Sequence, residues 1–100
     1  MNKLIIDTTD NKKTTIKLRL GRKTDQITQA AKPKSQTALI LIDSIIKRNK
    51  IMPTEIDEIE VNTGPGSFTG TRVGVSIANA LGFGLGIKVN QKPLVEPKYN

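Results

Sequence analysis

The chain has 100 residues, of which 36% are hydrophobic and 3% aromatic, with 16 Lys and Arg against 9 Asp and Glu and no Cys or His. This length predicts one small domain with an aliphatic core and marginal stability. The lack of Cys and His excludes disulfides within the chain, thiolate or imidazole metal sites, and every catalytic triad that needs His. The net charge of +7 fits either RNA contact or solubility alone, and the scattered basic residues leave both interpretations open.

The first 30 residues predict three antiparallel strands. A continuous apolar run in residues 3–8 indicates a central strand that is covered on both faces. The turn residues Asp10 and Asn11 separate it from residues 14–20, where apolar and polar side chains alternate as in a half-buried strand. After a second turn, the polar residues 23–28 suit a strand at the edge of a sheet.

A helix is predicted over residues 36–50. Pro33 interrupts the preceding pattern, and Ser35 is expected to cap the helix. The apolar stripe expected on this helix is Ala38, Leu39, Ile42, Ile45 and Ile46. Ile40 and Leu41 fall outside that stripe, either as ordinary exposed aliphatic residues or as a second contact face.

The remainder predicts a short strand over residues 59–62, a long helix and a last strand over 87–90. Residues 91–100 contain two prolines and are expected to be a tail, so that 1–90 form the domain. Three strands followed by helix, strand, helix and strand predict an α/β fold with a mixed sheet. This is the element order of the ribonuclease H-like domain, one half of the actin-like ATPase fold.

No segment is apolar for long enough to cross a membrane, and the N-terminal run is too short for a signal peptide. The longest apolar stretch, residues 73–87, is interrupted by polar side chains. We therefore expect a cytoplasmic protein that makes no membrane contact.

The segment VNTGPGSFTGTRVGVSIANALGFGLG, residues 61–86, is the least ordinary part of the chain. A glycine-rich turn before a helix can hold an anion on its backbone N–H groups. This turn lacks the spacing and the Lys of a P-loop, and Pro65 removes one donor. A tight turn is therefore favoured, in which Gly64 and Gly66 allow unusual dihedral angles and Ser67 or Thr69 caps the helix.

Small residues recur at every fourth position of the helix that follows. They are Gly70, Gly74, Ala78, Gly82 and Gly86. Each Gly inside a helix costs roughly 1 kcal/mol relative to Ala, so the row is expected to allow a close helix–helix contact. The stripe expected to face the sheet is Val73, Ile77, Leu81 and Leu85.

Val75 and Phe83 would then lie on the far side of this helix, beside Arg72 and Asn79. A large exposed aromatic side chain indicates a contact surface for another chain. The alternative is that the glycines fit the first helix of the same domain.

The run TGPGSFTGTRVGVSIANALG resembles the bacterial TsaB (YeaZ) family, whose proteins carry G-P-G-S-F-T-G-[LT]-R-[IV]-G at this place. The opening LIIDTT and the helix start SQTALILIDSII match the family as well. The resemblance covers nearly the whole chain but only the N-terminal half of a typical member, so the second domain is expected to be absent. It implies a non-catalytic scaffold subunit needed to make threonylcarbamoyladenosine (t6A) in tRNA.

The resemblance also implies partners. They are a TsaD-like catalytic subunit, a TsaE-like ATPase that joins the assembly, and a second copy of the chain through the same helical face. The expected interface is Thr37, Ile40, Leu41, Arg72, Gly74, Val75, Ala78, Asn79, Gly82 and Phe83. The signature loop is Gly64, Pro65, Gly66, Ser67, Phe68, Thr69, Gly70 and Arg72. No cofactor is expected on this chain alone, ATP and Mg²⁺ are expected on partner subunits, and tRNA contact is expected to be indirect.

Two other functions stay open. One is a minimal nucleotide-binding ATPase-fold module that uses the GPGSFTG loop, with Asp7 as a Mg²⁺-linked acid, although a lone Asp at a strand end is more often a turn or cap residue. The other is a basic RNA-binding module, whose weakness is the shortage of aromatic residues for stacking on bases. Without His, a glycoprotease-type activity is not expected.

Overall fold

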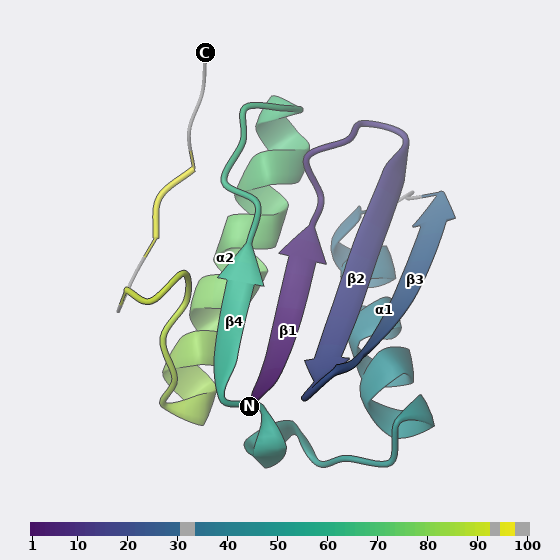
Figure 1. The fold of residues 1–100 in the computed structure, drawn as a ribbon. Helices are drawn as coiled ribbons and strands as arrows, with labels where there is room; N and C mark the ends of the chain where they lie inside the picture. Colours follow the sequence, from purple (N-terminus) through teal and green to yellow (C-terminus); the bar gives the residue numbers. More distant parts are fainter. Residues whose placement is uncertain (31–33, 93–94, 98–100) are drawn as a thin grey trace.

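A computed structural model describes residues 1–30, 34–92 and 95–97 as a four-stranded sheet with two helices on one face (Figure 1). The strands are β1 (Asn2–Asp7), β2 (Lys13–Leu20), β3 (Lys23–Ala30) and β4 (Glu58–Val61). The helices are α1 (Lys34–Arg48) and α2 (Phe68–Leu85), and the 3₁₀ turn η1 (Pro53–Glu55) precedes β4. The predicted α/β fold class and the three strands before the first helix are confirmed.

The sheet has the strand order β3-β2-β1-β4. β1 pairs with β2, and β2 with β3, in antiparallel register, whereas β4 lies parallel to β1. The two expected turns form: Asp10 accepts the Lys12 backbone N–H at 2.7 Å, and Gly21 takes a left-handed φ of +62°. A left-handed residue at that point lets the chain reverse within two residues.

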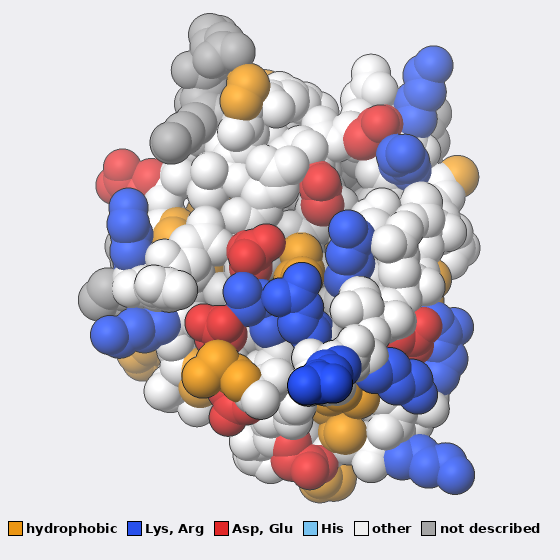
Figure 2. Space-filling model, viewed as in Figure 1, with side chains coloured by type: hydrophobic (Ala, Val, Ile, Leu, Met, Phe, Trp, Pro, Cys, Tyr) orange, Lys and Arg blue, Asp and Glu red, His pale blue; other side chains and the backbone are white. Residues whose placement is uncertain are grey.

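The core lies between the sheet and the two helices. The inward side chains of the sheet are buried: Leu4, Ile6, Ile16, Leu18, Ile59 and Val61. The opposite face carries charged and polar side chains (Figure 2). The prediction that β1 is covered on both faces is therefore wrong. Both helices lie on one side, so Ile5 sits half-buried on the open face, paired with Lys17 of β2.

Helix α1 buries a stripe that differs by one residue from the predicted one. The buried residues are Ala38, Leu41, Ile42, Ile45 and Ile46. Leu41 takes the place expected for Leu39, which is 52% exposed. Residues two positions apart are about 200° apart around a helix of 3.6 residues per turn. Leu39 and Leu41 therefore flank the stripe on opposite edges, and a small rotation of the helix decides which of them is buried.

The start of α1 and the end of the chain also depart from expectation. The helix begins at Lys34, so Ser35 lies inside its first turn and does not precede it as a cap. The expected break at Pro33 lies outside the described residues, as do 93–94 and 98–100 of the expected tail. Val95 is buried, and its backbone N–H and C=O pair with the Asn79 side chain at 3.1 and 2.9 Å, so this part of the tail packs on α2.

The expected last strand reduces to single bridges, and an asparagine continues the edge of the sheet. Val89 bridges to Ile59 in parallel. The Asn90 side chain then pairs with both backbone groups of Val61: its Oδ1 accepts the N–H at 2.8 Å and its Nδ2 donates to the C=O at 3.0 Å. The amide thus replaces one residue of a fifth strand and satisfies a strand edge that would otherwise be open.

An ion pair ties the end of α1 to the edge strand β3. Arg48 donates to both carboxylate oxygens of Asp25 at 2.8 and 2.6 Å, and Asn49 adds a third hydrogen bond at 2.8 Å. The hydrogen bonds from Arg48 and Asn49 hold the pKa of Asp25 well below its usual value. Arg48 also donates to the Gln26 carbonyl at 3.2 Å, which occupies an acceptor of β3.

This ion pair predicts a pH dependence of stability. Because folding lowers the pKa of Asp25, its charged carboxylate stabilises the fold at pH values above the unfolded pKa, about 3.9 for Asp. That stabilisation is lost as the pH falls from this value through the folded pKa. Urea unfolding from pH 5 to pH 2 should therefore show a steeper loss for the wild type than for Asp25→Asn. Asp7 titrates in both proteins and cancels in the comparison. Identical slopes would show that the pair contributes nothing to folding.

Candidate functional site

The glycine-rich loop uses two of its backbone donors in hydrogen bonds to neighbouring residues. Gly64 N–H donates to the Asn62 side chain at 3.0 Å, and Ser67 N–H donates to the Thr9 carbonyl at 2.7 Å. The Gly64-Pro65 bond is cis, and Pro65 has no N–H. A Cβ on Gly66 would come within 2.8 Å of the Thr9 carbonyl oxygen. The loop is therefore packed on the residues that follow β1, and phosphate binding by the loop stays a prediction.

Ser67 caps α2, as one of the two expected choices. Its hydroxyl accepts the Gly70 N–H at 3.2 Å, and its carbonyl accepts the Thr71 N–H at 2.8 Å. At the other end, Gly86 closes the helix with a left-handed φ of +68°. Both ends thus use standard capping chemistry.

The carboxylate of Asp7 accepts hydrogen bonds from neighbouring residues of the chain. One carboxylate oxygen accepts the Thr9 N–H and hydroxyl at 3.0 and 2.7 Å, and the other accepts from Asn62 at 3.2 Å. Burial raises the pKa of Asp7, but the hydrogen bonds from Thr9 and Asn62 outweigh it and the pKa is lowered. Among the described residues, no group of three or more His, Cys, Asp or Glu side chains could hold a metal ion. Asp7 therefore acts as a turn residue.

The glycine row of α2 faces the protein's own sheet. The buried residues of this helix are Gly70, Thr71, Gly74, Val75, Ala78 and Gly82. A Cβ on Gly74 would overlap the Thr8 hydroxyl, and one on Gly82 would come within 2.7 Å of Val89. The expectation that this row lies against another chain is wrong, because the helix backbone approaches β1 and Val89 too closely for larger side chains.

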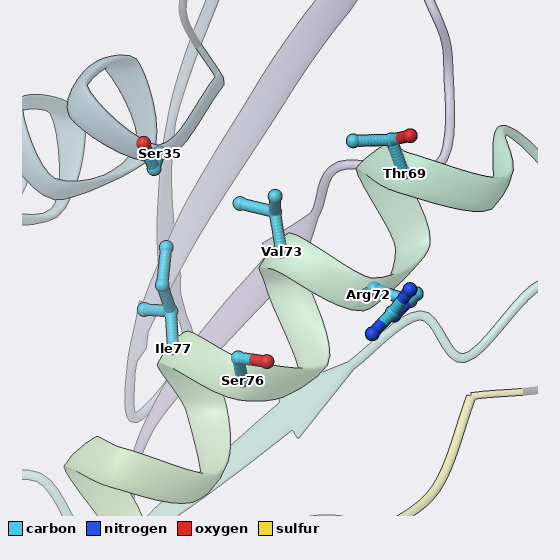
Figure 3. A pocket seen from close by; sticks show the side chains of 6 residues that line it. All are labelled: Ser35, Thr69, Arg72, Val73, Ser76 and Ile77. Carbon is cyan, nitrogen blue, oxygen red and sulfur yellow. The ribbon is translucent and has the colours of Figure 1, made fainter.

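The apolar stripe expected against the sheet is instead turned partly outward. Val73 and Ile77 are half-buried and point toward α1, where they line a hollow of about 360 Å³ with Ser35 (Figure 3). Thr69, Arg72 and Ser76 complete its lining. Arg72 points to the other side of α2 in that view and lies 5.3 Å from the Phe68 ring.

The expected interface residues divide into two sets. Ile40 and Phe83 are 62% and 92% exposed, and Arg72 is also exposed. Thr37 is half-buried and makes a contact of its own within the chain. The remaining members are used inside the domain: Leu41, Gly74, Val75, Ala78, Gly82 and Asn79.

The structure exposes residues that the sequence had assigned to other roles. Leu39 lies beside Ile40 on the exposed side of α1, and Ser35, Val73, Ser76 and Ile77 line the hollow. We call Leu39, Ile40, Val73, Ser76 and Ile77 the two-helix face. Sequence reasoning missed the outward position of Val73 and Ile77 because it assigned them to the core. The row of small residues on the other side of the helix could have indicated it, since small residues suit a helix packed closely on a sheet.

Comparison with known proteins decides the family. Residues 24–91 match the family model TsaD, described as tRNA N6-adenosine threonylcarbamoyltransferase. The chain belongs to this family. Curated relatives named TsaB and a solved structure of YeaZ make it a TsaB/YeaZ-type member.

Two curated relatives carry the name tRNA threonylcarbamoyladenosine biosynthesis protein TsaB. The one from Haemophilus influenzae is 34% identical over 86 residues, and the one from Bacillus subtilis is 33% identical over 66 residues. These matches cover 86% and 66% of this chain but 36% and 29% of the relatives. The chain thus spans about a third of the length of these proteins.

A solved structure confirms the fold. YeaZ from Pseudomonas aeruginosa superposes with a TM-score of 0.83 at 21% identity, over 88% of this chain and 41% of that one. A second structure, of a protein with similarity to YeaZ, has a TM-score of 0.84. The match again covers less than half of that chain, 43%. Among the described residues, no helix has the length and apolarity needed to span a membrane.

Proposed function

We propose that this chain is a non-catalytic scaffold part of the assembly that makes t6A in tRNA, and that it docks to a TsaD-like subunit through the two-helix face. The relatives named for threonylcarbamoyladenosine biosynthesis support the process. The exposed aliphatic side chains on neighbouring helices support the docking role. In the same proposal, ATP and Mg²⁺ belong to partner subunits, a TsaE-like ATPase joins the assembly, and the complex works in the cytoplasm.

The single observation that carries this proposal is the exposed apolar surface of α1 beside α2. Leu39 and Ile40 are 52% and 62% exposed. They lie on α1, which contributes Ser35 to the hollow that Val73 and Ile77 line. Exposed aliphatic side chains on a helix that borders such a hollow fit an apolar helix of a partner.

The loop chemistry supports a scaffold better than an ATPase. Three of its backbone donors are used by Thr9, Asn62 and Ser67, and Asp7 is held by three hydrogen bonds within the chain. Nothing in this arrangement favours phosphate or Mg²⁺ binding over the structural role.

The test is a charge placed on the two-helix face. Ile40→Asp should leave the fold intact, because the side chain is 62% exposed. It should weaken binding to the TsaD-like subunit of the same organism by about 2 kcal/mol or more, roughly thirtyfold, since a desolvated carboxylate would have no partner. Calorimetric titration measures the loss, and a melting curve checks the fold.

Met52→Asp is the matched control, because Met52 is 64% exposed and lies before η1, away from the two-helix face. It should bind as the wild type does. Sedimentation of the chain alone tests the competing occupant, a second copy of itself. Wild-type affinity in Ile40→Asp, or no binding of the TsaD-like subunit at all, would refute the proposed docking.

A further inference from the structure

Charge is unevenly distributed over the sheet. Residues 1–30 contain seven Lys and Arg against three Asp, whereas residues 51–60 contain four acidic residues and no basic one. Lys3 on β1 lies between these regions and pairs with Glu58 and Glu60 of β4 at 3.3 and 3.4 Å. The acidic side chains of β4 are therefore paired with a cation of β1, and the cations of β2 lie on the other side of β1 (Figure 2).

The open side of β2 carries a row of cations. Alternate residues of a strand share one face about 6.8 Å apart, which places Lys13, Lys17 and Arg19 along one line over roughly 20 Å. Lys12 precedes this row, and Arg22 follows it in the β2–β3 turn. We call these five residues the basic strand face.

Two members of this face are uncommitted within the domain. Neither Lys17 nor Arg19 has a carboxylate oxygen within 4.0 Å in the part of the chain that the structure describes. Their cross-strand neighbours are neutral or basic: Ile5 and Gln26 flank Lys17, and Lys3 and Thr24 flank Arg19. Three acids border the row. Asp10 accepts the Lys12 backbone N–H at 2.7 Å, Asp7 has its pKa lowered partly by the charge of Lys17, and Glu60 lines a hollow of about 410 Å³ together with Asp7 and Lys17.

We propose that the basic strand face binds the phosphate backbone of RNA directly. This inference rests on the proposed function, because it assigns a contact to the RNA that the assembly modifies. A line of fixed cations suits a backbone with regularly spaced phosphates. The hydroxyls of Thr15 and Thr28 lie 3.0 Å apart beside this row. Together with the Gln26 amide, they offer hydrogen bonds to phosphate or ribose. Ile5 offers a small apolar contact, and with no aromatic residue for stacking in this row, binding should be tolerant of base sequence.

The experiment measures RNA binding by the whole chain. The probe is a fluorescein-labelled single-stranded RNA, followed by anisotropy over a series of salt concentrations. Each single-strand phosphate contact contributes about 0.7 to the slope of log K against log salt. The double variant Lys17→Gln/Arg19→Gln should therefore reduce the slope by roughly 1.4 and weaken binding about 10- to 30-fold near 0.1 M salt.

Lys88→Gln/Lys92→Gln is the control, because it removes the same two charges beyond β4, where both side chains are exposed. It should change the affinity by less than about threefold, since its charges lie outside the basic strand face. Equal losses in the two double variants would overturn the inference and show that net charge alone attracts RNA. Equal or tighter binding of a poly-Glu peptide would also overturn it, in favour of an acidic protein partner.

Titration of the same Lys17→Gln/Arg19→Gln variant with the TsaD-like subunit separates this inference from the proposed function. Wild-type docking with weakened RNA binding supports both. Wild-type docking with unchanged RNA binding overturns only the RNA contact. Failure of the wild type to dock, with RNA binding that still depends on Lys17 and Arg19, overturns only the scaffold role.

Discussion

Gly82→Leu is expected to lower the free energy of unfolding by about 3 kcal/mol or more, and to leave little folded protein. A Cβ alone would come within 2.7 Å of Val89 Cγ2 and 2.9 Å of the Ile87 carbonyl oxygen. A leucine adds three further carbons in the same direction. The gain in helix propensity, about 0.8 kcal/mol, is too small to offset this overlap. Urea unfolding monitored by circular dichroism measures the change.

Gly84→Leu is the matched control on the same helix. Nothing lies within 4 Å of a Cβ at Gly84, and the residue is exposed. This variant should be more stable than the wild type by about 0.5 to 1 kcal/mol, from helix propensity alone. Similar stabilities for the two variants would contradict the orientation of α2 and would reopen the glycine row as a surface for another chain.

Gly74→Ala is expected to destabilise the fold by about 1 to 3 kcal/mol. The added methyl would overlap Thr8 Oγ1, whose hydroxyl donates to the Gly70 carbonyl. Thr8 is fully buried and its side chain is short, so it has little room to move aside. The same substitution at an open helical position would stabilise by about 1 kcal/mol, so the sign itself is diagnostic. Thermal and urea unfolding give the value.

A double-mutant cycle isolates the contact. Thr8→Ala alone should destabilise through the lost hydrogen bond and methyl, by about 1 to 2 kcal/mol. Adding Gly74→Ala in that background should then be neutral or stabilising, because the overlapping atom is gone. Thr8→Val should not rescue, since one of its methyl groups occupies the position of the hydroxyl. Additive losses in the Thr8→Ala pair would mean that the two residues do not touch.

The sequence by itself determined the four strands of the sheet, the turns between the first three, and the family. Alternation in β2 places Ile16 and Leu18 inside regardless of context, because a strand has a period of two. Asp10 and Gly21 supply turn chemistry that acts within a few residues. Ser67 likewise caps α2 through a contact three residues away. These features are local, so a linear pattern is enough to predict them.

Only the tertiary structure decided which faces of the two helices are buried. Val73 and Ile77 are more apolar than Gly74 and Ala78, so hydrophobicity alone chose the wrong stripe for α2. Close packing buries the stripe of small residues instead, because they let the α2 backbone approach Thr8 and Val89.

The same reason applies to the asparagines. Asn90 and Asn79 pair with the backbones of Val61 and Val95, at separations of 29 and 16 residues. No local pattern announces such partners. Shape complementarity and hydrogen-bond satisfaction between distant segments are properties of the assembled chain. They decided that the glycines lie inside and that the aliphatic residues of the two-helix face lie outside.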